Sequence, residues 1–96
     1  MIAQIRTYTI NKGMMESWIK IFQDEIMPRV LDAGMEVKLS AVNEEDTKFI
    51  WVRCFSDEAD LEQKEANFYG SDWWVANVDR VRSHLAHREI EVIKLI

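Results

Sequence analysis

The chain has 96 residues, of which 48% are hydrophobic and 30% are charged. This length predicts one domain spanning residues 1–96, which buries about 65% of its unfolded surface and is marginal in stability. The composition excludes the disordered and collagen-like classes. Lys and Arg number 12 against 17 Asp and Glu, giving a net charge of −5 without a basic cluster, so we expect no nucleic-acid partner.

Cysteine content and hydropathy indicate a compartment. Cys54 is the only cysteine and stands in an apolar run, as expected for a small buried hydrophobic residue in a reducing environment. The first ten residues alternate polar and apolar side chains and lack the apolar block of a signal peptide. No window approaches the roughly 20 apolar residues that span a membrane. We therefore expect a cytoplasmic protein with no membrane partner.

The first third of the chain predicts a strand followed by a long helix. Residues 2–10 are β-branched, aromatic and alternating, which indicates a strand. Apolar residues then recur every four positions from Met14 to Val30, which predicts an amphipathic helix. Pro28 removes one backbone donor, so we expect a kink or a fresh helix start there, and Gly34 is a natural left-handed stop.

Three further strands are predicted. Residues 35–43 alternate apolar and polar side chains and indicate a half-exposed strand. Residues 48–55 are rich in β-branched and aromatic side chains, which is typical of a central strand. Residues 89–96 close the chain as a strand.

Two helices are predicted between the third and fourth strands. Ser56 is the expected N-cap of the first helix, which ends at Gly70. Ser71 is the expected N-cap of the second, which runs to about Leu85.

The order of these elements, βαββαβ, predicts an α+β fold of the ferredoxin-like sandwich type, with an antiparallel sheet and helices on one face. Both faces of the sheet are predicted to carry large apolar groups. One face carries Ile2, Tyr8, Trp51, Phe55, Ile93 and Leu95, and the other carries Ile5, Ile50, Val52, Ile90 and Val92. A sheet that is apolar on both faces needs two covers. The simplest second cover is the sheet of another copy, so we expect a homodimer through the sheet faces.

The last helix carries two stripes that start from adjacent tryptophans. One stripe is wholly apolar and is predicted to lie in the core; it contains Trp74, Val78, Val81 and Leu85. The other mixes an aromatic ring, an amide, a cation and an imidazole; it contains Trp73, Asn77, Arg80 and His84. Such groups beside an apolar interior, with Trp18 as a further wall, are typical of a small-molecule pocket. The alternative is a solvated helix shoulder.

The sheet carries a second candidate site. Arg6 and Tyr8 share one face of the first strand, and Trp51 and Arg53 share one face of the third. If these faces coincide, two arginines lie among aromatic rings and need partners, for which Glu91 is the obvious carboxylate and Gln4 a further acceptor. One interpretation is a structural network that fixes strand register or the dimer seam. The other is a pair of cations, with Tyr8 as donor, that binds a carboxylate or enolate.

Metal and cofactor motifs are not predicted. His84 and His87 have only Glu89 as a third ligand and no nearby cysteine, and the motifs of phosphate-binding loops and nucleophile elbows do not occur. We expect neither a metal nor a cofactor.

Two segments resemble the NIPSNAP family. The run FIWVRCFSDEADLEQKEANFYGSDWW resembles its W-[VIL]-R-x-F strand, helix and F-Y-x-S-D-x-W block, and IRTYTINKG resembles its R-x-Y-x-[LI]-x-x-G opening. The resemblance extends over essentially the whole chain and implies a dimeric α/β barrel, in which ferredoxin-like domains pair sheet to sheet. The chain departs from the family at Trp73, where a polar residue is usual. It also departs at Leu61, Glu62 and Gln63, which replace common basic residues and argue against an anion site there.

Three functions are compatible with these features. The first is a binding protein for a small aromatic or apolar carboxylate or enolate, held between sheet and helices. The second, implied by relatives of the dimeric α/β barrel group, is a cofactor-independent monooxygenase or isomerase, with His84 or Tyr8 as base or donor and Arg6, Arg53 or Arg80 stabilising an anion. The third is a non-catalytic adaptor or structural dimer.

Overall fold

A computed structural model describes all 96 residues. Its elements are β1 (Ile2–Ile10), α1 (Met15–Ile21), the π-helical segment η1 (Phe22–Ile26), α2 (Met27–Asp32), β2 (Glu36–Val42), β3 (Lys48–Phe55), α3 (Glu58–Tyr69), α4 (Asp72–Arg82) and β4 (Leu85–Lys94). The strands form one antiparallel sheet in the order β2-β3-β1-β4. The predicted α+β, ferredoxin-like arrangement is therefore confirmed.

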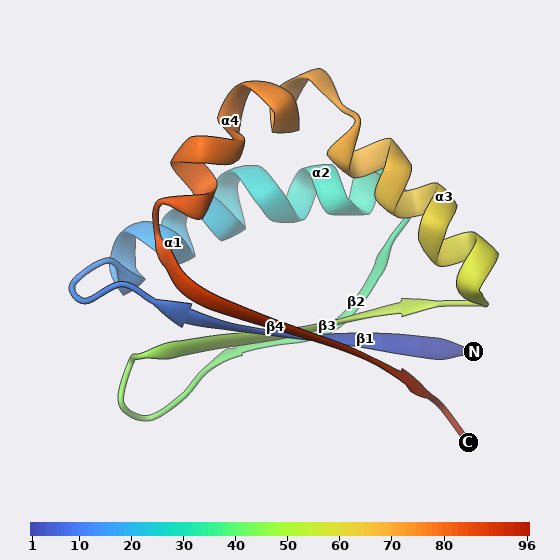
Figure 1. Ribbon diagram of the computed structural model, residues 1–96, viewed down its shortest axis with the longest axis horizontal. Helices are drawn as coiled ribbons and strands as arrows, with labels where there is room; N and C mark the ends of the chain where they lie inside the picture. The colour runs from blue at the N-terminus through green and yellow to red at the C-terminus, as the bar shows by residue number, and fades with distance from the viewer.

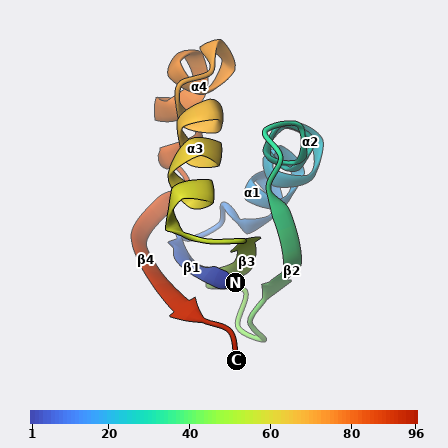
Figure 2. The same cartoon turned by 90° about the vertical axis from the view of Figure 1, so that its right-hand side faces the viewer.

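All helices lie over the same face of the sheet, and the opposite face is uncovered (Figure 1). Seen end on, the helices form two rows, with α1 and α2 towards β2 and with α3 and α4 towards β4 (Figure 2). No helix combines the length and the apolar character that crossing a membrane requires.

Pro28 is accommodated by a change of helix type. Met27 donates its backbone N–H to the carbonyl of Phe22, five residues earlier, which is the π-helical pattern. Because Pro28 has no N–H for the carbonyl of Asp24, the wider turn shifts the hydrogen bonds, and the proline falls in the first turn of α2. Ile26 and Met27 keep helical backbone angles, so the helix continues from η1 into α2 and the expected fresh helix start does not occur. Gly34 ends the helix with φ of 90°, as predicted.

The helix caps match the prediction at one of two positions. Ser71 caps α4, and its hydroxyl accepts from the backbone N–H of Trp74 at 3.2 Å. The predicted cap of α3 is wrong by one residue, because Asp57 accepts from the N–H of Asp60 at 2.8 Å. Ser56 instead donates its backbone N–H to the Asp60 carboxylate at 2.9 Å, so the two ends of the first turn satisfy each other.

The final strand begins earlier than predicted. β4 starts at Leu85, directly after α4 ends at Arg82, and the predicted start was Glu89. Leu85 pairs with Ile10 of β1 across an irregularity next to Thr9. The sequence has no clear alternation of polar and apolar residues at this irregular pairing. Helical spacing alone therefore places Leu85 at the end of the apolar stripe of α4.

The core fills the layer between helices and sheet. Residues at alternate positions of β1 and β3 point to the helices and meet the apolar stripe of the first helix, which is buried as predicted. The buried cluster is rich in rings, and the centroids of Phe22 and Phe49 are 4.6 Å apart. Its members include Tyr8, Trp18, Phe22, Ile26, Val30, Phe49, Trp51, Phe55, Leu61, Phe68 and Val81.

The uncovered face is apolar at its centre. Alternation places Ile5 and its partner Val52 on this face, opposite to Tyr8 and Trp51. The same face carries Leu39, Ala41, Ile50 and Ile93. The grouping predicted for β4 is wrong, since Ile90 pairs with Arg6 and points to the helix side, whereas Ile93 points away.

Candidate functional site

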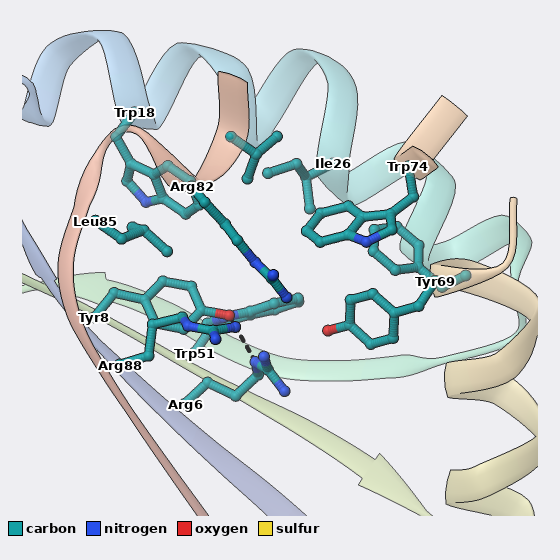
Figure 3. A pocket seen from close by; sticks show the side chains of 12 residues that line it. Arg6, Tyr8, Trp18, Ile26, Trp51, Tyr69, Trp74, Arg82, Leu85 and Arg88 are labelled. Carbon is teal, nitrogen blue, oxygen red and sulfur yellow. Dashed lines mark hydrogen bonds between the residues drawn. The ribbon is translucent and has the colours of Figure 1, made fainter. Parts of the chain in front are cut away.

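A cavity lies between the helix side of the sheet and the helices (Figure 3). Its lining residues come from β1, β3, β4 and the helices, and they are Arg6, Tyr8, Trp18, Ile26, Trp51, Phe68, Tyr69, Trp74, Val81, Arg82, Leu85 and Arg88. The cavity contains about 390 Å³ of space free of protein atoms, but water molecules can be centred in only about 30 Å³ of it. Since one water needs roughly 10–15 Å³ by this measure, the space now holds a few waters at most.

Polar groups gather at the sheet end of the cavity. Arg6 is buried and donates from Nε to the Tyr8 hydroxyl at 2.6 Å and from Nη1 to Gln4 Oε1 at 3.0 Å. Its Nη2 donates no hydrogen bond within the chain. Figure 3 shows the Tyr8 and Tyr69 hydroxyls converging with the Arg6 guanidinium on this end of the cavity. We call Arg6, Tyr8 and Tyr69 the polar floor.

Arg53 belongs to a saturated network behind the polar floor. It is fully buried and donates from Nε to Gln4 Oε1 at 2.9 Å, from Nη1 to the Tyr69 hydroxyl at 3.2 Å and from Nη2 to Glu65 at 2.6 Å. Its guanidinium also lies 5.0 Å from the centroid of the Trp51 ring. All three nitrogens therefore have partners, and the geometry favours the structural interpretation for Arg53.

The carboxylate partner of the arginines comes from a helix. Glu65 of α3 lies 2.6 Å from Arg53 and 3.8 Å from Arg6. The predicted partner, Glu91, is wrong, because Glu91 pairs with Ile5 and points to the uncovered face. The face question that the sequence left open is settled, since both arginines point to the helices, and the predicted acceptor Gln4 is confirmed.

The environment keeps Arg6 charged. Burial by itself lowers the pKa of Arg6, but Tyr8, Tyr69 and Glu65 together raise the pKa above its usual value. The polar floor therefore presents a permanent cation that only one more distant carboxylate compensates.

Two further arginines stand at the mouth of the cavity. Arg82, the last residue of α4, and Arg88 of β4 are both exposed and line the cavity and the open grooves outside it. Neither has a carboxylate within 4.0 Å nor a side-chain hydrogen bond. In Figure 3 the Arg82 side chain runs across the cavity from α4 towards the polar floor, and its guanidinium lies 5.7 Å from the Trp74 ring centroid.

Two buried indole groups also lack partners. Nε1 of Trp18 and Nε1 of Trp51 are inaccessible to solvent and donate to no acceptor. Both tryptophans line the cavity. A buried N–H without an acceptor costs about 1–3 kcal/mol, so the region around the cavity is short of acceptors rather than of donors.

The two adjacent tryptophans have different surroundings. Trp74, from the stripe predicted to be core, lines the cavity together with Val81 and Leu85. Trp73 lies away from the cavity, where the Arg29 guanidinium stacks 4.5 Å from its ring centroid.

The polar stripe of α4 is tied to the π-helical segment instead of the cavity. Arg80 contacts both carboxylate oxygens of Glu25 at 2.6 and 3.1 Å and donates to Asn77 Oδ1 at 3.0 Å. Asn77 in turn donates to the carbonyl of Trp73 at 2.8 Å. Hydrogen bonds from Arg80 lower the pKa of Glu25 below its ordinary value. Arg80 is therefore exposed and Asn77 half-buried in a network with Glu25, away from the cavity.

His84 is buried but held on both sides. Its Nδ1 lies 3.0 Å from the carbonyl of Arg80, which only accepts, so Nδ1 carries the proton. Nε2 lies 2.9 Å from the Ser17 hydroxyl, from which it accepts in the neutral ring. His84 does not line the cavity. Of the two residues predicted as base or donor, only Tyr8 lies at the polar floor.

Three cavity residues were missed as site residues. Tyr69 ends α3, and Arg82 and Arg88 flank the junction of α4 with β4. The signal for Tyr69 was its place two residues before the helix N-cap Ser71, which fixes the end of one helix against the start of the next. Elsewhere, the chain contains no group of three or more His, Cys, Asp or Glu side chains that could hold a metal ion, and His87 contacts only Glu89 at 3.4 Å.

Comparison with known proteins gives structural matches only. No protein-family model and no curated protein matches the chain. An uncharacterised NIPSNAP domain protein from Burkholderia xenovorans superimposes with a TM-score of 0.90 at 19% identity, over 100% of this chain and 95% of that one. A NIPSNAP family protein of unknown function from Agrobacterium tumefaciens gives 0.91 at 20% identity, over 99% and 87% of the two chains.

The chain has the NIPSNAP fold. A putative antibiotic biosynthesis monooxygenase from Nitrosomonas europaea is also similar, with a TM-score of 0.77 at 11% identity over 100% of this chain and 99% of that one. The fold implied by the NIPSNAP resemblance is therefore confirmed, and the Nitrosomonas europaea protein shares it.

Proposed function

We propose that the chain is a NIPSNAP family protein that binds a small aromatic carboxylate or enolate in the cavity. The observation that carries this proposal is the polar floor, where a buried arginine with an unused Nη2 group stands beside two tyrosine hydroxyls under aromatic walls. A carboxylate is the acceptor that such donors match, because charge-assisted hydrogen bonds are the strong ones.

The walls fit an aromatic ring. Trp18, Trp51, Phe68 and Trp74 surround the space above the polar floor, and aromatic faces and edges pack favourably against another ring. The ring has no room beside the Arg82 side chain as it now lies. Binding therefore requires Arg82 to swing towards solvent, which is a change of rotamer in an exposed side chain.

A titration monitored by tryptophan fluorescence tests the proposal. Three of the four tryptophans line the cavity, so a bound aromatic acid changes the emission. Benzoate, 4-hydroxybenzoate and phenylpyruvate form the panel, and benzamide is the neutral control. We expect saturable changes and a raised melting temperature with the acids and much weaker binding of benzamide. Equal responses to benzoate and benzamide, or no response to any compound, would exclude the proposed site.

Cofactor-independent monooxygenase activity is a second candidate. It is favoured by the fold shared with the protein described as a putative antibiotic biosynthesis monooxygenase and by the apolar walls, which suit an activated aromatic anion. In this case Tyr8 and Arg6 hold the phenolate or enolate of an electron-rich polyphenol that itself reduces O₂. An oxygen electrode records consumption that needs both protein and polyphenol, or the candidate fails.

We also propose a homodimer through the uncovered sheet face. The apolar centre of that face supports it, since no element of the chain covers it and such patches mark interaction sites. An adaptor that uses this face for other proteins is the remaining alternative. It predicts a monomer whose cavity binds none of the acids above.

A further inference from the structure

We propose that the natural ligand is an aromatic diacid whose second acidic group is held at the cavity mouth by Arg82 and Arg88. This inference rests on the proposed function and names its substrate class. The first acidic group occupies the polar floor, the ring occupies the aromatic walls, and the second group faces the two mouth arginines.

The positive charge around the cavity is the reason for proposing a ligand with a second acidic group. Four arginines, Arg6, Arg53, Arg82 and Arg88, lie at or directly behind the cavity, and Glu65 is the only carboxylate that contacts any of them. The whole chain nevertheless carries a net charge of −5. A concentrated positive region on an acidic protein attracts small anions to this place.

Arg82 and Arg88, the mouth arginines, form no ion pair or side-chain hydrogen bond that would explain a structural role. Arg80, their neighbour on α4, makes a two-point ion pair with Glu25. Arg53 is saturated by Gln4, Tyr69 and Glu65. Arg82 and Arg88, in contrast, contact no carboxylate, and Arg82 is held only over the Trp74 ring.

Strand register fixes Arg88 on the ligand side. Arg88 is the direct partner of Tyr8 across β1 and β4 and therefore points to the same face of the sheet. Directly opposite residues lie about 4.5–5.5 Å apart at their Cβ atoms, so the longer arginine reaches past the tyrosine to the rim. Arg88 also lines both open grooves outside the cavity, together with Ile90.

Arg82 completes the mouth from the opposite side. It ends α4 and extends across the cavity towards the polar floor (Figure 3). When a ring enters, the guanidinium is displaced outward to the rim, where Arg88 already stands. Two arginines without carboxylates then face the outer end of the ligand, and a forked pair of guanidinium groups matches a carboxylate or similar oxyanion.

Competition between monoacids and diacids tests the inference. Benzoate and the three benzenedicarboxylates, with groups in ortho, meta or para positions, are titrated calorimetrically at low ionic strength into the wild-type chain. The variants are Arg82→Gln and Arg88→Gln, singly and together. Arg80→Gln is the charge-matched control on α4, and Lys94→Gln is the control on β4.

We expect at least one dicarboxylate to bind about tenfold more tightly than benzoate. The double variant loses this preference, so that the dicarboxylate and benzoate bind it with affinities within about threefold of each other, and both controls retain the preference. Benzoate binding without any preference for a diacid overturns the inference and leaves the proposed function standing. An equal loss of preference in the controls also overturns it, because a bulk charge effect would then explain the result. Failure of every acid to bind the wild type overturns both.

Discussion

Tyr8 and Tyr69 each accept a hydrogen bond from an arginine and keep their own hydroxyl hydrogen for another acceptor. Arg6 donates to Tyr8 at 2.6 Å, and Arg53 donates to Tyr69 at 3.2 Å. A hydroxyl that already accepts from a cation is a better donor, because hydrogen bonds in a chain polarise one another. The polar floor is thus prepared for an oxyanion before one arrives.

Replacing Tyr69 by Phe separates ligand binding from folding. We expect the affinity for benzoate to fall about fivefold, because one neutral hydrogen bond to the ligand is lost. The free energy of unfolding falls by only about 1 kcal/mol, since Arg53 keeps Gln4 and Glu65 as partners. Calorimetric titration and urea denaturation measure the two effects, and an unchanged affinity would remove Tyr69 from the site.

Arg53, in contrast to Tyr69, is expected to affect the stability of the fold more than the affinity for a ligand. The Arg53→Met variant removes the donor of Glu65 and leaves Gln4 with Arg6 as its remaining donor, so we expect the free energy of unfolding to fall by about 3 kcal/mol in urea titrations. Glu65 is partly exposed, which allows some rehydration. Arg80→Met is the control and costs less than about 1 kcal/mol, because its pair is at the surface. Equal losses for the two variants would contradict the structural role of Arg53.

At the scale of elements, the two helix rows are joined by one ion pair. Arg80 of α4 and Glu25 of η1 connect segments 55 positions apart in the sequence. The π-helical segment places Glu25 for this contact and Ile26 in the cavity wall. The π-helical turn that accommodates Pro28 therefore also shapes the site, in keeping with the frequent occurrence of π-bulges at functional positions.

The Glu25–Arg80 pair predicts an acid-dependent loss of stability. Hydrogen bonds from Arg80 lower the folded-state pKa of Glu25, so the contribution is fully present above the ordinary value of 4.5 and is lost as the pH falls through the lowered one. Compared with Glu25→Gln, we expect the wild type to be more stable by about 0.5 kcal/mol at pH 7. Thermal unfolding of both proteins from pH 7 to pH 3 measures the difference. A gap that stays constant over this range would contradict the account.

Periodicity predicted the elements well, and it also predicted that the Trp74 stripe of α4 faces the interior. Alternation correctly placed Arg6 with Tyr8 on one face of β1 and Trp51 with Arg53 on one face of β3, and the register between the two strands puts both faces on the helix side. Helical spacing could not predict the partner of the second stripe, because Arg80 contacts Glu25 of η1, which lies 55 positions away in the sequence.

Partners from distant elements could not be predicted from the sequence. Glu65 stands in a charged run of the sequence with no signal that points to the sheet, yet its carboxylate lies 2.6 Å from Arg53. Glu91 had a suitable strand neighbour but stands on the wrong face, because β4 pairs with β1 in a register that its weak alternation does not specify.

At the scale of the whole molecule, the sheet separates the proposed ligand side from the proposed assembly side. The helix side holds the cavity, and the uncovered side presents Ile5, Leu39, Ile50 and Val52. Leu39 of the edge strand β2 lies beside Val52 on this face and is 49% exposed, which is costly for a large apolar side chain and consistent with a partner there. The two sides can therefore be altered independently.

A charge on the uncovered face is expected to prevent dimer formation. Val52→Asp places a carboxylate at the centre of the apolar patch, and a buried unpaired charge opposes association. Leu31→Asp is the control, since Leu31 is 53% exposed on α2, away from that face. Sedimentation at micromolar concentration should give dimers for the wild type and the control but monomers for Val52→Asp. A wild-type mass near 11.3 kDa would contradict the proposed homodimer.

The central claim is that the polar floor binds a small aromatic oxyanion through Arg6. Calorimetric titration of benzoate into the wild type and into Arg6→Gln, at pH 7 and low salt, tests it most directly. The account predicts saturable one-to-one binding by the wild type and a loss of at least about tenfold in affinity for the variant, as expected for a charge-assisted hydrogen bond. Equal affinities in the two proteins, or no binding by the wild type, would contradict it.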